Sequence, residues 1–566
     1  MGRTGSMHYP DHVSEIVDPR GDLQWGTIPG LVEDAAARFG AAEAVVDAHG
    51  PGGTTVRLTY DQLAEEAAAA TRAVLANGIE RGDRVAIWAP NCAEWVLAAL
   101  GAVGAGALLV PLNTRYKGAE AAYILQQSGA RMLFTAQGFL GTDYPAMLAE
   151  ATAVMALPDL ERVVLLHTGD GGEDRATARG DQVVDWTVFL HEGACVPSDV
   201  AAGRTASITS GDLSDILFTS GTTGRPKGAM TTHGQTLRTF ATWAEVVGLR
   251  AGDRYLVVNP FFHTFGYKAG ILASLMAGAT VVAEPVFDVD AVMARIAAER
   301  ITVLPGPPTV LRTILDHPDR KACDLSSLRL VVTGAAPVPV ELVHRLRSEL
   351  GVETVLTAYG LTEATGTVTM CRRGDPAEVV SGTSGRAIPD VEVRVVGEGG
   401  DELPRGEPGE VVVRGYNVMR GYFNDPDATD ATVDAEGWLH TGDVGVMDPE
   451  GNLDITDRLK DMLVSGGFNV YPAEVEAVLG DHPGVAQVAV VGVPDDRMGE
   501  VGCAFVVASE AGPVVGEEEL VGWARERLAN FKVPRHVVVV PSLPVNAGGK
   551  VLKRELRERF GGSGAP

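Results

Sequence analysis

The chain has 566 residues, a formal net charge of -27, 45% hydrophobic residues and 21% charged residues. One hydrophobic core does not serve a chain of this length, so two or more domains are expected. The acidic balance argues against nucleic acid or an anionic membrane surface as a partner, because both require a basic face on the protein.

Cysteine usage and hydropathy indicate a soluble, cytoplasmic protein. The five cysteines are scattered without a C-x-x-C pair, which fits a reducing compartment and gives no metal or disulfide pattern. The N-terminus has no charged and then apolar leader. The longest apolar run, residues 96–112, contains glycines and a proline. It predicts a buried helix to about residue 105 and a buried strand over 107–112, and no integral membrane segment.

Strands and helices alternate through the first third of the chain. The pattern predicts a helix over residues 28–39, a strand over 43–47 and a helix that Thr59 caps, with Gln62 three residues later. Such alternation implies right-handed βαβ units on mostly parallel sheets. Residues 165–212 are rich in Gly, Asp, Thr and Ser, and we expect a surface excursion without function there.

The stretch FTSGTTGRPKG at residues 218–228 is predicted to bind phosphate. It follows a hydrophobic run, its glycines permit close backbone approach, its hydroxyls donate and its lysine supplies a point charge. It is not a Walker loop, which requires G-x-x-x-x-G-K-[ST]. A solvated linker is the alternative for such a composition. The predicted ligands are Thr219, Ser220, Gly221, Thr222, Thr223, Gly224 and Lys227.

Two further turns follow predicted strands. NPFFHTFG at 259–266 places His263 among aromatic residues, at the kind of strand end where open α/β sheets form pockets. Gly334, Ala335 and Ala336 follow the strand at 330–333, and small residues there allow a flat ring or an acyl chain to lie on the backbone. Taken alone, these patterns also fit a packed loop histidine and an ordinary tight turn.

The segment YGLTE at 359–363 combines an aromatic ring, a hydroxyl and a carboxylate. Tyr359 can stack on adenine, Thr362 can donate to the α-phosphate and Glu363 can hold Mg²⁺. Further on, Asp443 in GWLHTGD can accept from both ribose hydroxyls, or form an Asx-turn. Strand-end packing is the alternative for YGLTE by itself.

Together these motifs resemble the adenylate-forming superfamily of acyl-CoA synthetases, carrier-protein adenylation domains and luciferases. The resemblance runs from about residue 30 to residue 557. It implies an α/β fold with a large N-terminal domain of βαβ-built sheets plus a β-rich subdomain, and a small mobile α+β C-terminal domain. The implied boundaries are residues 1–457, a hinge at 458–461, and residues 462–566.

The resemblance also implies roles for single residues. The motif that contains His263 borders the acyl pocket, which this histidine or a neighbouring aromatic residue gates. Arg458 contacts ribose or phosphate, Lys460 is the pivot, and Lys550 is inserted to complete adenylation. A flexible loop at residues 465–469, which contains Ser465, Gly466, Gly467 and Phe468, would line the pantetheine tunnel after rotation. Phosphates of CoA could find Lys532, Arg535, Lys553 and Arg554, for which a solvated basic face is the alternative.

The implied reaction joins a carboxylic acid to AMP from ATP, with Mg²⁺, and then transfers the acyl group to CoA. Three motif sequences most resemble those of actinobacterial ligases for polycyclic acids, either steroid C/D-ring propionates or terpenoid acids. They are DILFTSGTTGRPKG, NPFFHTFGYKAGILA and TAYGLTEATG. Open alternatives are one half-reaction only, with a partner enzyme supplying the acyl-adenylate, and a stand-alone enzyme that loads a carrier protein. A non-catalytic relative, a luciferase-type oxygenase and a homodimer are further possibilities.

Overall fold

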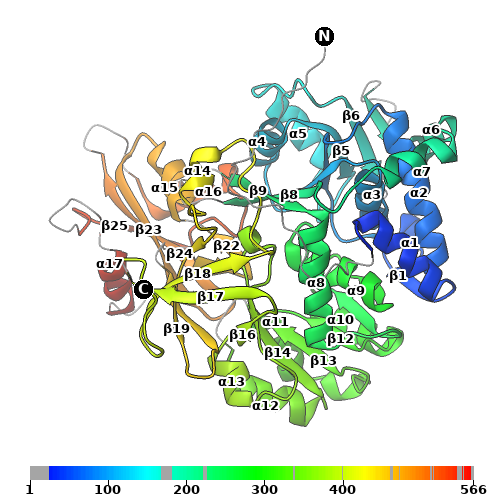
Figure 1. The fold of residues 1–566 in the computed structure, drawn as a ribbon. Helices are drawn as coiled ribbons and strands as arrows, with labels where there is room; N and C mark the ends of the chain where they lie inside the picture. The colour runs from blue at the N-terminus through cyan, green and yellow to red at the C-terminus, as the bar shows by residue number, and fades with distance from the viewer. Residues whose placement is uncertain are drawn as a thin grey trace.

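The computed structural model describes residues 25–166, 182–220, 226–334, 338–397, 399–458, 463–470, 472–509, 513, 515–544, 551 and 553–562. Within these ranges the strands form four sheets, three in a large N-terminal part and one in a small C-terminal domain (Figure 1). The predicted α/β class and this division are confirmed. No helix of the described residues is long and apolar enough to cross a membrane.

The first sheet has seven strands in the order β7-β6-β5-β3-β4-β8-β9. Neighbours are parallel except β8 and β9, which form an antiparallel hairpin. The strands are β3 (Arg84–Trp88), β4 (Leu108–Pro111), β5 (Ala130–Ala136), β6 (Arg162–Leu166), β7 (Val183–Asp185), β8 (Leu213–Ser220) and β9 (Pro226–Thr232). The intervening helices are α2 (Tyr60–Ala76), α3 (Ala93–Gly104), α4 (Gly118–Ser128), α5 (Tyr144–Thr152), α6 (Trp186–Glu192) and α7 (Ser198–Ala206).

The second sheet has nine strands in the order β16-β15-β14-β13-β12-β10-β11-β1-β2. Its six inner strands are parallel, and the strands at both edges run antiparallel to their neighbours. The strands are β1 (Glu43–Asp47), β2 (Val56–Thr59), β10 (Arg254–Val257), β11 (Thr280–Ala283), β12 (Val303–Pro305), β13 (Leu330–Thr333), β14 (Thr354–Tyr359), β15 (Thr369–Met370) and β16 (Arg386–Ala387).

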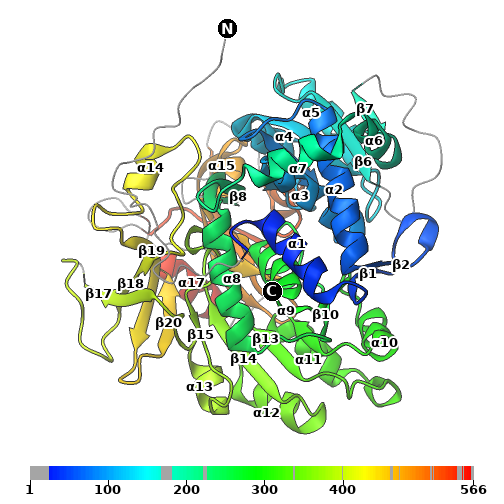
Figure 2. The same ribbon diagram turned by 45° about the vertical axis from the view of Figure 1, so that its right-hand side comes forward.

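The helices that accompany the second sheet include α8, which runs down the centre of the N-terminal part in two views (Figures 1 and 2). Before α9 lies a π-helical segment, Phe265–Leu272. The helices are α1 (Ile28–Phe39), α8 (His233–Val247), α9 (Ala273–Ala277), α10 (Val289–Glu299), α11 (Pro308–Asp316), α12 (Val340–Glu349) and α13 (Ala377–Gly382).

The third sheet is the predicted β-rich section. Its four antiparallel strands are β17 (Val391–Val396), β18 (Gly409–Gly415), β19 (Leu439–Met447) and β20 (Leu453–Arg458), with α14 (Pro426–Asp430) between β18 and β19.

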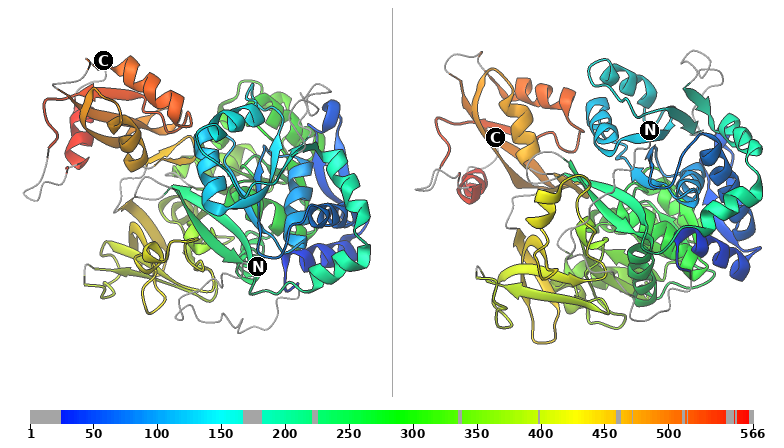
Figure 3. Two further views of the ribbon diagram at one scale, coloured as in Figure 1. Left: turned by 90° about the horizontal axis from the view of Figure 1, so that it is seen from above. Right: turned by 45° about the horizontal axis from the view of Figure 1, so that its top comes forward.

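The C-terminal domain has one mixed sheet and its own hydrophobic core. Figure 3 shows it as the orange and red unit beside the N-terminal part. Its strands are β21 (Leu463–Ser465), β22 (Phe468–Val470), β23 (Val485–Asp495), β24 (Gly499–Ala508) and β25 (His536–Val539). Its helices are α15 (Pro472–Gly480), α16 (Glu517–Arg527) and α17 (Lys553–Gly562).

Two side-chain hydrogen bonds explain where helix α2 begins. Thr59 accepts from the backbone N–H of Gln62 at 3.2 Å, and the Gln62 side chain accepts from the N–H of Thr59 at 2.9 Å. This reciprocal capping box starts α2 where the sequence predicts it. The helix over residues 28–39 and the strand over 43–47 also have the predicted bounds.

Two expectations were wrong. The section 165–212 is not simply a surface excursion, because its described residues form β7, α6 and α7, and Trp186 and Phe189 pack edge-on against Phe134 in the core. The expected flexible loop at 465–469 is instead a tight hairpin turn between β21 and β22. Gly466 and Gly467 have φ values of 57° and 83°, the left-handed conformation that a two-residue hairpin turn requires.

Candidate active site

A cavity of about 1720 Å³ lies where the carboxyl ends of both large sheets meet the third sheet and the C-terminal domain. Such edges are where open α/β sheets bind ligands. All but one of the predicted site residues whose side chains the structure describes line it. They are Thr219, Lys227, His263, Gly334, Tyr359, Thr362, Glu363, Asp443, Gly466, Gly467 and Phe468.

The exception is Ser465, which is 3% exposed within β21 and does not line the cavity. The structure therefore does not bring its hydroxyl to the site. Some predicted residues lie outside the described residues, and their roles stay predictions: Gly221, Thr222, Thr223, Gly224, Ala335, Ala336, Lys460 and Lys550, together with the side chains of Ser220 and Arg458.

Glu363 lies where the β8–β9 hairpin meets the turn after β14. Its Oε1 atom accepts from the hydroxyl of Thr219 at 3.2 Å and from that of Tyr422 at 2.9 Å. The Nζ atom of Lys227 is 5.1 Å from the centre of the Tyr422 ring. A lysine, a carboxylate and two hydroxyls from separate parts of the chain thus gather beside the predicted phosphate loop.

This carboxylate fits a magnesium ion. Mg²⁺ is commonly bound through one or two carboxylates and takes its remaining ligands from substrate phosphates and water. Glu363 would hold the ion, which when bound offsets charge on the phosphates. No group of three or more His, Cys, Asp and Glu side chains in the described ranges could hold a metal by itself.

Tyr359 and Asp443, the predicted adenine and ribose ligands, meet at another part of the cavity. The Tyr359 hydroxyl donates to Oδ2 of Asp443 at 2.6 Å. The backbone N–H of Asp443 donates to the hydroxyl of Thr441 at 3.1 Å, and that hydroxyl donates to the carbonyl oxygen of Val411 at 2.7 Å. Asp443 is therefore a strand residue oriented by its neighbours, and these contacts do not form an Asx-turn.

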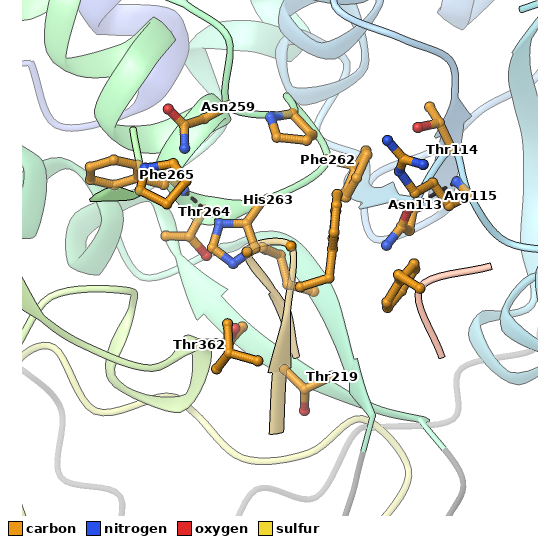
Figure 4. Close-up of a pocket in the computed structure, with 18 of the residues that line it drawn as sticks. Asn113, Thr114, Arg115, Thr219, Asn259, Phe262, His263, Thr264, Phe265 and Thr362 are labelled. Carbon is orange, nitrogen blue, oxygen red and sulfur yellow. Dashed lines mark hydrogen bonds between the residues drawn. The ribbon is translucent and has the colours of Figure 1, made fainter. Parts of the chain in front are cut away.

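The loop after β10 forms an aromatic wall of the cavity. Figure 4 shows Phe262, His263 and Phe265 on this loop, with Thr219 and Thr362 on another side of the cavity. Trp243 of α8 adds a further ring to the lining, and its ring centroid is 6.2 Å from that of Phe265. An apolar wall of this kind suits a hydrocarbon group better than a phosphate.

His263 borders the cavity as a neutral ring. Its Nδ1 atom accepts the backbone N–H of Phe265 at 3.2 Å, which assigns the remaining ring proton to Nε2. Solvent reaches the ring at the cavity, but the surrounding protein desolvates it and lowers the pKa of the imidazole below its ordinary value. A neutral imidazole is compatible with an apolar group beside it, as the predicted gating role requires.

Asn91 holds this loop in place, and sequence reasoning missed it. Its Nδ2 atom lies 3.0 Å from the carbonyl oxygens of Val257 and Asn259 and 3.1 Å from that of Glu284, and its Oδ1 atom accepts from the N–H of Phe261 at 2.7 Å. The side chain thus ties the end of β3 in one large sheet to the loop after β10 in the other. Its position just after a buried strand was the available signal.

The C-terminal domain closes the cavity on a third side. Gly466, Gly467 and Phe468 of the β21–β22 turn line it, together with three arginines. Those guanidinium groups supply positive charge for an anionic ligand, as CoA phosphates require. The arginines are Arg497, Arg525 and Arg535.

The structure describes the side chains of three of the four basic residues that were predicted to contact CoA phosphates, and they differ in how free their charges are. Arg535 lines the cavity. Lys532 is 2% exposed and engaged by two carboxylates, and Lys553 pairs with Glu476 at 2.7 Å. The Arg554 side chain lies outside the described residues. Lys532 also lines the cavity, but its ammonium is paired with Glu120 and Glu474 in this arrangement, so its contact with a CoA phosphate stays a prediction.

Comparison with known proteins agrees with this site. Residues 32–423 match the family described as AMP-binding enzyme, and residues 474–550 match the AMP-binding enzyme C-terminal domain. A relative from Rhodococcus jostii, named 3-[(3aS,4S,7aS)-7a-methyl-1,5-dioxo-octahydro-1H-inden-4-yl]propanoyl:CoA ligase, is 51% identical over 535 residues, 94% of this chain and 98% of that protein. A protein of the same name from Mycobacterium tuberculosis is 52% identical over 502 residues, 89% of this chain and 94% of that protein.

A solved structure is also similar. The amide bond synthetase McbA from Marinactinospora thermotolerans superimposes with a TM-score of 0.78 at 30% identity, over 94% of this chain and 99% of that one. The site and these matches identify an AMP-forming acid–thiol ligase that uses ATP, Mg²⁺ and CoA. The chain belongs to the AMP-binding enzyme family.

Proposed function

We propose that the acid is a propanoate side chain on a fused-ring carbon skeleton, which this ligase converts to its CoA thioester through an acyl-adenylate. The observation that carries the proposal is 51% identity, over 94% of the chain, to a relative named for such an acid. The cavity supports it, because about 1720 Å³ with walls that include Trp243, Phe262 and Phe265 has space for rings as well as nucleotide and CoA.

In the first half-reaction the acid's carboxylate attacks the α-phosphorus of ATP. A carboxylate C–O–P bond forms, the bond to the bridging oxygen breaks and pyrophosphate leaves. Catalysis of such a transfer is mainly positioning and electrostatic stabilisation. In our proposal Lys227 and the 218–228 loop hold the pyrophosphate end, Tyr359 and Asp443 the adenosine, and Thr362 an α-phosphate oxygen.

Lys550 is the proposed catalytic cation of this step. Its ammonium group would lie between the carboxylate and the α-phosphate oxygens, where negative charge accumulates in the transition state. Glu363 would hold Mg²⁺ against the phosphates. His263 would border the acyl group, with its neutral ring against the hydrocarbon.

In the second half-reaction the CoA thiol, as thiolate, attacks the acyl carbon and AMP leaves with the electrons of the C–O bond. The proposed arrangement for this step is the one in the structure, with Gly466, Gly467 and Phe468 on the cavity. Helix α17, which follows Lys550 in the chain, lies at the outer edge of the C-terminal domain (Figures 1 and 3). Adenylation would then need a different domain placement.

We assign that change to rotation of residues 462–566 against 1–457 about a hinge at 458–461, with Lys460 as the pivot and Arg458 contacting ribose or phosphate. A Lys460→Pro substitution restricts backbone rotation at the pivot. It should block thioester formation and spare adenylation. Equal loss in both half-reactions would show that Lys460 is not the pivot.

A substrate panel tests the proposed acid. Purified protein is given ATP, Mg²⁺ and CoA with a fused-ring propanoic acid, a medium-chain fatty acid or an aryl propenoic acid, and the thioester is quantified by mass spectrometry. We expect kcat/KM for the fused-ring acid to exceed the others at least tenfold. A preference for the fatty or aryl acid contradicts the proposed substrate while leaving the ligase class intact.

Three alternatives involve a second protein: a partner enzyme, a carrier protein or another copy of this chain. Thioester formation only from a supplied acyl-adenylate would indicate that a partner enzyme performs the first step. Acyl transfer to a carrier protein's phosphopantetheine arm, with free CoA ignored, would indicate a loading enzyme. Sedimentation at several protein concentrations tests the predicted homodimer.

A further inference from the structure

A buried ammonium group joins the two parts of the molecule. The Nζ atom of Lys532 lies 2.8 Å from Oε1 of Glu120 and 2.7 Å from Oε1 of Glu474. Lys532 and Glu474 belong to the C-terminal domain, whereas Glu120 is on α4 of the N-terminal part. Lys532 is only 2% exposed and its partners are largely shielded, so this triad lies inside the contact between the domains.

Glu120 is held ready for this contact by its own helix. It occupies the third position of α4, and its Oε2 atom accepts the backbone N–H of Lys117 at 2.9 Å. The other carboxylate oxygen is thereby directed to Lys532. The Lys532 ammonium also lies 4.8 Å from the centre of the Tyr116 ring, within the range of a cation–π interaction. The N-terminal part therefore offers a carboxylate and an aromatic face to one cation.

The charge balance of the triad depends on the domain arrangement. Burial disfavours the charged form of Lys532, but the attraction of Glu120 and Glu474 outweighs burial and raises the pKa of the ammonium above its ordinary value. A buried charge that loses a partner is strongly destabilised. If the C-terminal domain moves away from α4, Lys532 loses Glu120 and the Tyr116 ring together.

The triad adjoins the turn that lines the cavity. Phe531, the neighbour of Lys532, packs on Phe468 with ring centroids 4.7 Å apart. The guanidinium of Arg115, next to Tyr116, lies 5.3 Å from the centre of the same Phe468 ring. The ion pair and the aromatic stack therefore hold the β21–β22 turn against one edge of the N-terminal part.

We propose that Lys532, Glu120 and Glu474 form an electrostatic clamp that selects the domain arrangement in which Gly466, Gly467 and Phe468 line the cavity. Lys532 is thus a positioning residue for thioester formation. It is not needed for adenylation, which uses another arrangement. This inference rests on the proposed division of the two half-reactions between domain arrangements.

Glu120→Gln is the sharpest test, because glutamine still caps a helix from the third position while its charge is lost. Thioester formation from synthetic acyl-adenylate and CoA should fall at least tenfold, with pyrophosphate exchange unchanged or faster. Lys532→Met should reduce thioester formation to a similar extent. The variant with both substitutions should form thioester only slightly more slowly than either single variant. Glu341→Gln, which removes an exposed carboxylate from the first turn of α12, is the matched control and should change neither rate.

Hydrogen–deuterium exchange supplies a readout that does not depend on activity. In Glu120→Gln, amides of residues 529–533 and 468–470 should exchange faster, while those of β3 and β5 keep the wild-type rate. Equal loss of both half-reactions, or unchanged thioester formation with unchanged exchange, overturns the clamp. If the wild-type protein itself makes no thioester from supplied acyl-adenylate, the proposed function fails instead, and the exchange rates still decide whether the triad joins the domains.

Discussion

The phenol of Tyr359 donates a 2.6 Å hydrogen bond to Oδ2 of Asp443, 84 residues further along the chain. One residue ends a strand of the nine-stranded sheet and the other lies in the antiparallel third sheet. The bond joins the predicted adenine platform to the predicted ribose ligand. If Tyr359 and Asp443 have these predicted roles, orientation of the nucleotide depends on contact between two sheets.

Tyr359→Phe keeps the ring and removes this bond. Asp443 loses a charge-assisted hydrogen bond, a kind worth about 1.5–3 kcal/mol, so we expect KM for ATP to rise roughly ten- to a hundredfold. The KM for the acid should change little, because the acyl wall is elsewhere in the cavity. Steady-state kinetics with each substrate varied in turn measures both constants. An unchanged KM for ATP would show that the bond does not orient the nucleotide.

If Glu363 holds Mg²⁺, substitutions at Glu363 and at its neighbour Tyr422 should reduce activity to different extents. Glu363→Gln should shift activation to higher Mg²⁺ concentrations and lower kcat by about 10²–10³, the usual effect of losing one electrostatic contribution to the transition state. Tyr422→Phe removes only a hydrogen bond to that carboxylate and should cost less than about tenfold. Magnesium titrations of both variants check the order. Equal effects, or wild-type magnesium dependence in Glu363→Gln, would contradict the assignment.

Asn91→Ala should damage the acyl wall selectively. It leaves three carbonyl oxygens and the N–H of Phe261 without this partner, so the loop that carries Phe262 and His263 loses its anchor. We expect KM for the acid to rise at least tenfold, with KM for ATP within twofold of wild type. Asn77→Ala, which removes side-chain bonds at the end of α2, is the control and should alter stability alone. A parallel rise in both KM values would mean that Asn91 acts only on the fold.

Acid stability should depend on His233. Burial lowers the pKa of this imidazole from 6.5 to about 4, and its Nδ1 atom accepts the N–H of Ile28. The folded state thus keeps the ring neutral, whereas the unfolded state takes up a proton as the pH falls through 6.5. The neutral His233 ring therefore makes its full contribution to the free energy of unfolding above pH 6.5. That contribution is lost as the pH falls from about 6.5 to 4, which lowers the free energy of unfolding by up to about 3 kcal/mol.

Denaturant unfolding at pH 7 and pH 4 measures this loss. His233→Gln should be less stable than wild type at pH 7 and should lose about 3 kcal/mol less between the two pH values. His344→Gln, on an exposed position of α12, is the control and should follow the wild type. If His233→Gln and the wild type lose the same free energy of unfolding between pH 7 and pH 4, His233 is not the group responsible.

The sequence predicts the side chains that follow strand ends. Because parallel strands end at one edge of a sheet, Gly334 after β13 and Tyr359 at the end of β14 could be expected near one another from the sequence, and both line the cavity. Thr219 also lines it, but it comes from the other large sheet, and strand ends alone do not predict that meeting. The capping box at Thr59 was equally accessible, since its partners are three residues apart.

Contacts between distant segments could not be predicted in this way. Lys532 meets Glu120 across 412 residues, and Asn91 meets the Asn259 carbonyl across 168. Lys532 looks like part of a solvated basic face until its partners are known. The section 165–212 was misjudged for a related reason, because Trp186 and Phe189 are buried by a strand more than forty residues away.

In our proposal, one chain performs both half-reactions with different parts of its C-terminal domain. A split assay on Lys550→Ala tests it most directly, with pyrophosphate exchange from acid, ATP and Mg²⁺ in one arm and thioester from synthetic acyl-adenylate and CoA in the other. We predict that the variant loses exchange by about 10²–10³ and keeps thioester formation within a few-fold of wild type. Exchange at the wild-type rate, or loss of both activities together, would contradict the account.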